Sequence, residues 1–418
     1  MINRYNSFSL LALAAAGIAS TASASGILRE QTTTAYLATA GAGQVADISA
    51  SAAFNNPAGL AYLSQPEIQG NLLLTEDSFH FYDQGSTGTN DDFDNRRKNT
   101  DYGVGLTGGG SFFYGQPLAQ DWGIGFALTS PAGGATDAGE NWVGSNFIES
   151  IEVLIAVAQV AVGYQISPQW SLGASVGVSY MSWELDLSPF PQASENLDLD
   201  DTKLAWALGA MYRPGENTRI GLRYVAGVDH EVTGPAIIKT QMGSTEYQTS
   251  QEFNLADLVT LSLDQQLTPN LTLLADIEWA NWSEMKESRI IHEGGPTVIV
   301  PRDWQDAWGG AVGLAYKVSP SLSLKVGVNY DESAASKSNH KIDPPLDRTI
   351  AYSAGVDWTL NDSTEFNIGY QYLDFGDIEV NQTIDGFDPI AGKPFSQRVI
   401  GESEAHVHIV SLGIKKKF

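Results

Sequence analysis

The 418-residue chain carries 49 acidic and 23 basic residues, a formal net charge of -26 at pH 7, and no cysteine. The negative charge excludes a nucleic-acid-binding protein, because phosphate backbones demand a basic surface. The lack of cysteine excludes a disulfide framework and a thiolate metal site. The length would allow two or three soluble domains, but no Pro- or Ser-rich linker divides the chain.

The first segment, residues 1–24, has the three parts of a secretion signal. Arg4 supplies a basic start, an apolar stretch runs from Phe8 to Ile18, and Ala22-Ser23-Ala24 is a small-x-small cleavage pattern. The apolar stretch is too short for a membrane-spanning helix, which needs roughly 20 residues. We therefore expect an exported protein whose mature chain begins at Ser25.

Residues 25–65 are small and polar, and they do not resemble a membrane strand. Short helices are expected near 45–50 and 57–63. Because Pro57 fixes its own φ angle and Asn56 can bond to its own backbone, Asn56-Pro57-Ala58 predicts a defined turn. Such a segment would either hang in the periplasm or fold into the lumen. We expect 25–65 to fold into the lumen as a plug (the hatch), because a wide barrel without one would leak water and small solutes.

From residue 66 onward, apolar and polar residues alternate in one segment after another, most clearly in 170–180 and 322–330. This period is expected of strands that show one face to lipid and the other to a lumen. Aromatic residues such as Trp170 and Tyr180 stand at the ends of the apolar faces, as in the interfacial girdles of membrane barrels. The expected strands lie near 66–82, 102–116, 121–129, 151–165, 170–183, 202–213, 218–229, 252–266, 270–282, 306–318, 321–331, 349–360, 364–375 and 405–418.

Short, turn-rich links alternate with long connections between these strands, which is typical of outer-membrane barrels with their long loops outside the cell. The chain is therefore predicted to be all-β: a 14-stranded antiparallel transmembrane β-barrel over 66–418 in the outer membrane of a Gram-negative bacterium, plugged by 25–65. Its outer surface should contact lipopolysaccharide and outer-membrane lipid, and the last strand, ending in Phe418, should be recognised by the barrel-assembly machinery. The long loops are predicted at 83–101, 130–150, 184–201, 230–251, 283–305, 332–348 and 376–404.

The stretch 42–60, which contains Asn55-Asn56-Pro57-Ala58-Gly59, resembles the N-terminal hatch of the FadL family. Members of that family carry long-chain fatty acids and, in the TodX branch, aromatic hydrocarbons across the outer membrane. Further segments resemble later landmarks of the family in the same order. They are Trp279-Ala280-Asn281-Trp282-Ser283, Asp306-Ala307-Trp308, Tyr330-Asp331-Glu332-Ser333 and Pro345-Leu346-Asp347-Arg348.

The resemblance implies passive transport in three steps: capture in a groove between two outer loops, transfer to an interior pocket beside the N-terminus, and lateral release through a gap made by a kinked strand. By position, 184–201 and 230–251 are the two loops. An alternative is that the apolar residues of 184–201 only pack against neighbouring loops. The candidate groove residues are Leu185, Leu187, Phe190, Leu197 and Leu199.

Ile27 matches the position at which the family places an apolar residue in the pocket. A fatty carboxylate would favour a nearby cation, and the candidates are Arg223 and Lys325 in the lumen and Arg302 near the outer rim; each could instead be hydrated or paired with an acid. Gln305 stands where well-known members carry lysine, which leaves neutral hydrocarbons open. For Asn56, Pro57 and Ala58, gating and simply holding the plug remain equal alternatives.

The predicted function is passive transport of hydrophobic molecules, with long-chain fatty acids as the first candidate and aromatic or aliphatic hydrocarbons as the alternative. A general diffusion porin would need an open lumen, and a surface adhesin would need larger outer domains. An enzyme is disfavoured because the six histidines are scattered and no Gly-x-Ser-x-Gly elbow is present. No cofactor and no metal site are predicted.

Overall fold

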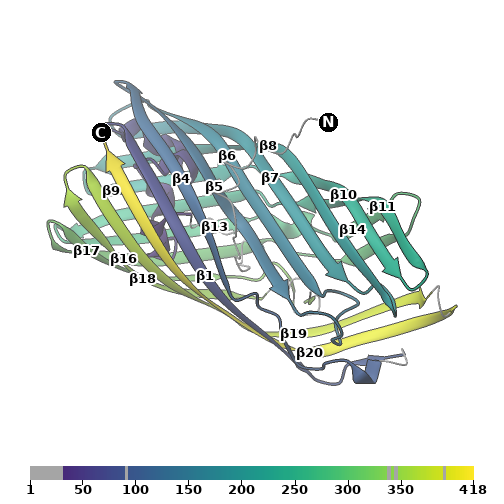
Figure 1. Ribbon diagram of the computed structural model, residues 1–418. Coiled ribbons are helices and arrows are strands. Elements are labelled where there is room, and N and C mark those ends of the chain that lie inside the picture. Colours follow the sequence, from purple (N-terminus) through teal and green to yellow (C-terminus); the bar gives the residue numbers. More distant parts are fainter. Residues whose placement is uncertain (1–31, 90–92, 337–339, 343–346, 389–391) are drawn as a thin grey trace.

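The computed structural model describes residues 32–418 apart from 90–92, 337–339, 343–346 and 389–391. The predicted secretion signal and Ile27 lie outside the described residues, and both stay predictions. In the described residues, no helix has the length and apolar character needed to cross a membrane. Figure 1 shows a closed strand wall with the hatch inside it, toward the end where the C-terminus lies.

The hatch contains four short helices, α1 (Thr34–Leu37), η2 (Gln44–Ala46), α2 (Ala52–Asn55) and η3 (Pro57–Tyr62). Two further short helices, η4 (Phe93–Asn95) and η5 (Trp282–Glu284), lie outside the hatch. The strands are β1 (Glu67–Asp83), β2 (Thr87–Gly88), β3 (Thr100–Asp101), β4 (Leu106–Ala119), β5 (Trp122–Asp137), β6 (Ser150–Gln165), β7 (Trp170–Leu187), β8 (Ala193–Gly215), β9 (Thr218–Val225), β10 (Asp229–Thr240), β11 (Gly243–Asn254), β12 (Leu258–Thr268), β13 (Leu271–Ala280), β14 (Glu287–His292), β15 (Thr297–Pro301), β16 (Ala307–Ser319), β17 (Leu322–Asp331), β18 (Thr349–Asn361), β19 (Thr364–Asp388) and β20 (Lys393–Lys417).

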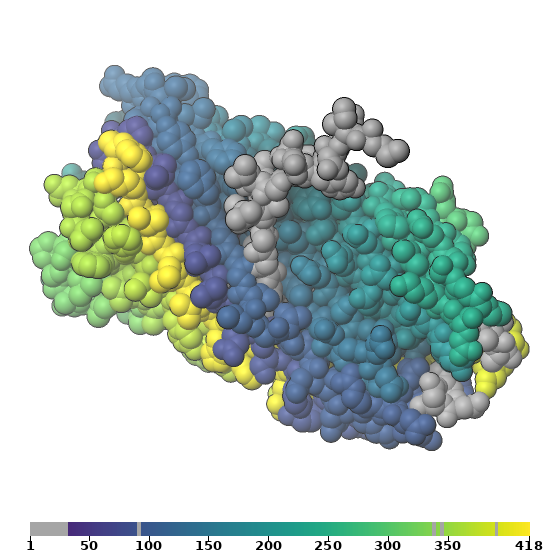
Figure 2. Space-filling view, viewed as in Figure 1, coloured from purple at the N-terminus to yellow at the C-terminus, as the bar shows by residue number. Residues whose placement is uncertain are grey.

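The wall is antiparallel throughout and closes where β1 pairs with β20, from Glu67 opposite Lys417 to Asp83 opposite Gly401. These two strands run side by side across the surface in Figure 2. The short strands β2, β3, β14 and β15 lie beyond the wall, whereas β9 with β10 and β11 with β12 each form one interrupted wall strand. The described residues therefore confirm a wall of fourteen strands. The exposed Phe418 donates its N–H to Pro66 O (2.9 Å) at this closure; its recognition by the assembly machinery stays a prediction.

Alternating residues face lipid and lumen as the sequence predicts. On β7, Val176 and Val178 are exposed on the outer surface, whereas Ser175 and Ser179 are buried inside. Aromatic pairs mark the ends of the outer apolar belt near the short turns. Trp122 stacks on Tyr164 with ring centroids 4.4 Å apart, and Trp170 stacks on Tyr212 at 4.5 Å.

Three connections predicted as long loops are instead largely strand, so the prediction of loops at 184–201, 230–251 and 376–404 was wrong. The hairpins β7–β8, β10–β11 and β19–β20 continue their ladders beyond the membrane. Paired strands satisfy each other's backbone groups in water as well as in lipid, so the ladder need not end at the membrane surface. Two predicted strands are also interrupted, at 226–228 and 255–257.

Glycines on the inner face of the wall allow the hatch to approach closely. A Cβ on Gly221 would overlap Val45 O, and one on Gly173 would overlap Ala58 N. The strands therefore have glycine at the positions where the hatch backbone contacts them. The wall glycines whose Cβ would meet hatch atoms are Gly115, Gly123, Gly125, Gly163, Gly173, Gly209, Gly221, Gly313, Gly327, Gly355, Gly369 and Gly413.

Candidate functional site

The hatch is fastened by buried hydrogen bonds, and Asn56 makes three of them. Its Nδ2 donates to Val45 O (2.7 Å) and to Ala210 O of β8 (3.1 Å), and its Oδ1 accepts from Ala58 N (3.1 Å). Pro57 begins η3, where its missing N–H costs no helical bond. The carbonyl of Ala58 accepts from Ser171 Oγ of β7 (2.9 Å). The predicted Asn56-Pro57-Ala58 turn thus ties one part of the hatch to another and to the wall.

We expect Asn56→Ala to loosen the hatch without unfolding the barrel. The change removes three buried hydrogen bonds, each worth about 1 kcal/mol, and leaves Val45 O and Ala210 O without this donor. Hydrogen exchange of the amides in 44–62 should speed up at least tenfold, while the amides of β17 and β18 keep their rates. Equal rates for the variant and the parent protein in 44–62 would contradict this role.

An interior cavity lies directly outward of α2, with about 550 Å³ of space, part of it open to solvent. Its walls are mostly apolar, with polar groups at Gln159, Ser179 and Arg223. Sequence reasoning identified Arg223 but missed the rest, because period-2 alternation does not show which inward side chains share a height in the barrel. The cavity is lined by Phe54, Pro131, Ile155, Val157, Gln159, Ser179, Ala205, Trp206, Ala207, Arg223, Val225, Ala226, Val228, Leu255, Ala256 and Leu258.

Of the three predicted cations, the structure places Arg223 at this cavity. Its side chain is 2% exposed, and its guanidinium carbon lies 4.9 Å from the centre of the Phe54 ring. Lys325 lies elsewhere: its Nζ pairs with Asp357 Oδ2 (2.7 Å) and donates to Ala35 O of the hatch (3.2 Å). Arg302 lies beside the outer β14–β15 hairpin, where its Nε donates to Ser288 Oγ (2.9 Å).

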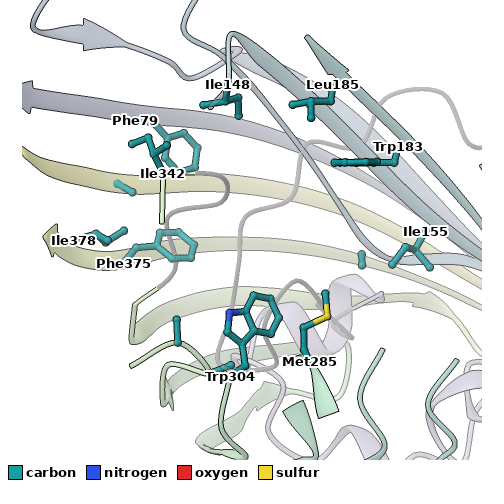
Figure 3. Packing of buried hydrophobic residues seen from close by; sticks show 14 of the residues in the cluster. Phe79, Ile148, Ile155, Trp183, Leu185, Met285, Trp304, Ile342, Phe375 and Ile378 are labelled. Carbon is teal, nitrogen blue, oxygen red and sulfur yellow. The ribbon is translucent and has the colours of Figure 1, made fainter. Parts of the chain in front are cut away.

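Cavity-lining residues such as Ile155 and Leu258 belong to one large apolar cluster that extends toward the outer end. Figure 3 shows side chains from β1, β6, β7, β19 and the outer connections around this space, with Trp183 and Trp304 on separate elements. The predicted groove residues belong partly to this cluster. Leu185, Leu197 and Leu199 are buried in the β7–β8 hairpin, whereas Leu187 and Phe190 are half-buried; their place in a capture groove stays a prediction.

The outer hairpins also contain a buried pair of titratable groups that sequence reasoning missed. Glu195 of β8 is 6% exposed, with its Oε1 3.3 Å from His292 Nε2 of β14. Thr249 Oγ1 lies 2.8 Å from Nδ1 of the same ring. Burial raises the pKa of Glu195 to about 7 and lowers the pKa of His292, because a buried charge loses its hydration. Both shifts favour a neutral carboxyl beside a neutral imidazole.

Glu195 should make the outer hairpins less stable as pH rises from about 4.5 to about 7. Unfolded, this carboxyl loses its proton near its ordinary pKa of 4.5, whereas in the fold it holds the proton until about pH 7. The loss by pH 8 is roughly 3 kcal/mol. Glu195→Gln cannot ionise, so it should match the parent protein at pH 4, below the unfolded pKa, and be more stable at pH 8. Amide protection factors in β8 and β10 at both pH values test this, and a pH-independent difference would contradict it.

The wall has an interrupted seam between β4 and β5. Their ladder runs from Ala119 opposite Trp122 to Phe112 opposite Leu128 and stops there. A bulge follows in β5 between Thr129 and Ala132, and the next contact between the two sides is the bridge of Gly103 to Thr136. At membrane depth, backbone groups without a neighbouring strand occur only where they line a cavity or are covered by protein. The seam is therefore a candidate gap in the wall.

A hydrogen-bonded Ser179–His230–Asp201 chain borders the cavity. Ser179 Oγ lies 3.0 Å from His230 Nε2, and Asp201 Oδ2 lies 3.2 Å from Nδ1 of that ring. No sequence pattern points to it, because the three residues are far apart and have no motif spacing. Ser179 lies in the middle of a paired strand and not on the exposed turn that presents a hydrolase nucleophile. These hydrogen bonds thus connect β7, β8 and β10.

Comparisons with known proteins agree with this architecture. A long-chain fatty acid transport protein of Salmonella typhi is 21% identical over 302 residues, which cover 64% of this chain and 69% of that protein. Outer membrane protein P1 of Haemophilus influenzae is 26% identical over 171 residues, 40% of this chain and 37% of that protein.

Among solved structures, a Pseudomonas aeruginosa FadL homologue superposes with a TM-score of 0.83 at 17% identity, covering 94% of this chain and all of that one. The Pseudomonas putida toluene transporter TodX superposes with a TM-score of 0.65 at 17% identity, covering 88% and 94%. At these identities the superpositions establish the fold alone. The family model described as outer membrane protein transport protein (OMPP1/FadL/TodX) matches residues 15–418, and the chain therefore belongs to this family of outer-membrane transport proteins.

Proposed function

We propose that the protein carries hydrophobic molecules, in the first place long-chain fatty acids, passively across the outer membrane. The observation that carries this proposal is the apolar interior: one cluster of buried hydrophobic side chains joins the wall strands, the outer connections and the hatch, whereas the lumen of a diffusion porin is polar. An alkyl chain gains about 0.8 kcal/mol per buried CH₂, so an apolar interior can draw it from water with no energy source.

The proposed route has three steps. Ligand is captured among the outer hairpins, where Leu187 and Phe190 remain partly accessible. It then enters the cavity beside Phe54, and it leaves sideways through the β4–β5 seam, because the hatch blocks the periplasmic end. We further propose that residues 1–24 are a cleaved secretion signal and that the outer surface contacts lipopolysaccharide.

Arg223 supports fatty acids over neutral hydrocarbons. A buried guanidinium in a mostly apolar cavity suits a ligand with one anionic end and a long apolar tail. The fatty-acid names of several relatives agree. Aromatic or aliphatic hydrocarbons remain the alternative, since TodX is a toluene transporter with the same fold and Arg223 already packs its charge over the Phe54 ring.

Uptake by cells with and without the gene tests the proposal. Radiolabelled oleate and toluene should be supplied separately at limiting concentrations. Oleate uptake that depends on the gene supports the fatty-acid proposal, and dependence for toluene alone supports the alternative. If neither uptake depends on the gene, transport of both ligand classes is contradicted.

A further inference from the structure

The wall has a second interrupted seam, on the far side of the cavity from the first. β8 pairs with β9 from Gly215 to Ala207 and with β10 from Asp200 to Ala193. In this described part of the wall, no register pair joins 201–206 to 226–232. One backbone bond crosses near the lower end, from Ala226 N to Trp206 O (3.2 Å).

Side chains hydrogen-bond to the backbone at both ends of the β9–β10 break. At the outer border, Asp201 Oδ2 accepts from Glu231 N (2.9 Å) and contacts His230. On the side of the break away from β8, Asp257 Oδ1 accepts from Gly227 N (2.7 Å) and Tyr224 OH (3.0 Å), so 226–228 is bonded to the β11–β12 side of the wall. Asp201 thus replaces ladder bonds across the outer end of the seam, and Asp257 fixes the break from its other side, so the interruption is a defined part of the fold.

The two seams lie at the same depth in the wall. Pro131 at the first seam comes nine residues after β5 begins, and Gly227 at the second comes nine residues after β9 begins. Both strands begin at short turns of the periplasmic end. Because a membrane-crossing strand takes about 9–11 residues, both seams lie toward the outer-leaflet side of the hydrocarbon layer.

The interior cavity reaches both seams. Its lining includes Pro131 at the first, and Ala205, Ala226 and Val228 at the second. It also includes Trp206, whose side chain is 39% exposed on the outer surface. The lower part of the second seam is thus bordered by small apolar residues on the inside and by an aromatic residue on the lipid side, whereas Asp201, Lys203 and His230 border its outer part.

We propose that the seam between β8 and the β9–β10 break is a second lateral portal, through which the alkyl or aromatic body of the cargo passes between the cavity and the outer-leaflet hydrocarbon. This inference rests on the proposed function. The small apolar residues of its lower part suit an uncharged chain about as wide as a methylene, and the two portals share one cavity. Release therefore does not depend on the β4–β5 seam alone.

Chemical staples across each seam test the proposal, and the absence of cysteine from the chain makes every introduced thiol unique. The flanking register places Leu204 opposite Asp229, and both side chains are exposed on the outer surface. The pair Leu204→Cys and Asp229→Cys, joined by a bifunctional thiol reagent cleavable by reductant, closes the second seam from outside and leaves the cavity unfilled. For the first seam the pair is Leu106→Cys and Ala135→Cys. The Gly103–Thr136 bridge places Ala135 diagonally across the seam from Leu106; Leu106 is exposed on the outer surface, and Ala135 shares the face of its exposed partner Glu152.

Gene-dependent oleate uptake is measured before stapling, after stapling and after reduction, with the single-cysteine variants as controls for labelling. Either staple alone should leave uptake within about twofold, and both together should lower it at least tenfold, with recovery on reduction. Loss of uptake with the Leu106–Ala135 staple alone would overturn the second portal.

Unchanged uptake with both staples would overturn release through the wall while leaving transport itself intact. Absence of gene-dependent uptake in the unstapled protein would contradict the proposed function, and the portal with it. The unstapled and stapled measurements therefore distinguish a failed transport proposal from a failed portal.

Discussion

Gly221→Val is expected to turn a plugged barrel into an open one. At this position of β9 a Cβ would overlap Val45 O and crowd Ala46 N, so the hatch must be displaced from its contact with β9. Valine itself suits a strand, and the wall should still form. Once displaced, the hatch no longer fills the lumen of a fourteen-strand barrel, which is wide enough to conduct ions.

Single-channel conductance in planar bilayers measures this effect, and it should rise at least fivefold over the parent protein. Gly215→Val is the matched control, because it lies at the neighbouring turn and an added Cβ there meets no atom within 4 Å. Heat-modifiable gel mobility shows that both variants keep a folded barrel. Equal conductance of the two variants would mean that the hatch tolerates the extra carbon atoms or does not seal the lumen.

The strand wall and the hatch were predictable because each follows from one local property. Alternation reports that a strand has two different faces, as in β7 and β17, and a small, polar segment before the wall has little other place than the lumen. Alternation does not report which face meets lipid. Alternation also does not show where a ladder ends. The ladder of β7 and β8 continues into the outer hairpin, where Leu185 and Leu197 are buried, although a loop was predicted there.

The height of a residue in the barrel was the other missing quantity. Lys325 and Arg223 are both inward-facing, as predicted, but Lys325 is paired with Asp357 at the level of the hatch, while Arg223 lies at the cavity. Height depends on the shear of the whole wall, which no single strand encodes. The break at 226–228 was missed for a related reason: its residues are small and apolar, so the pattern of β9 runs through it unchanged.

Arg223→Met is expected to separate the two candidate ligand classes. Methionine keeps apolar contact with Phe54 and removes the charge. A hydrogen bond to a charged group contributes about 1.5–3 kcal/mol, so oleate uptake at limiting concentration should fall at least tenfold. Toluene has no anionic group to lose, and its uptake, if it is carried at all, should stay within about twofold.

Arg223→Lys is the matched variant for this test, because it keeps the positive charge but not the planar guanidinium. If a carboxylate binds there, lysine should retain more oleate uptake than methionine does. Equal loss of oleate and toluene uptake in Arg223→Met would instead indicate a collapsed cavity, with Arg223 holding Phe54 and the hatch in place. Unchanged oleate uptake would indicate that the carboxylate binds at another part of the route and that Arg223 only packs over the Phe54 ring.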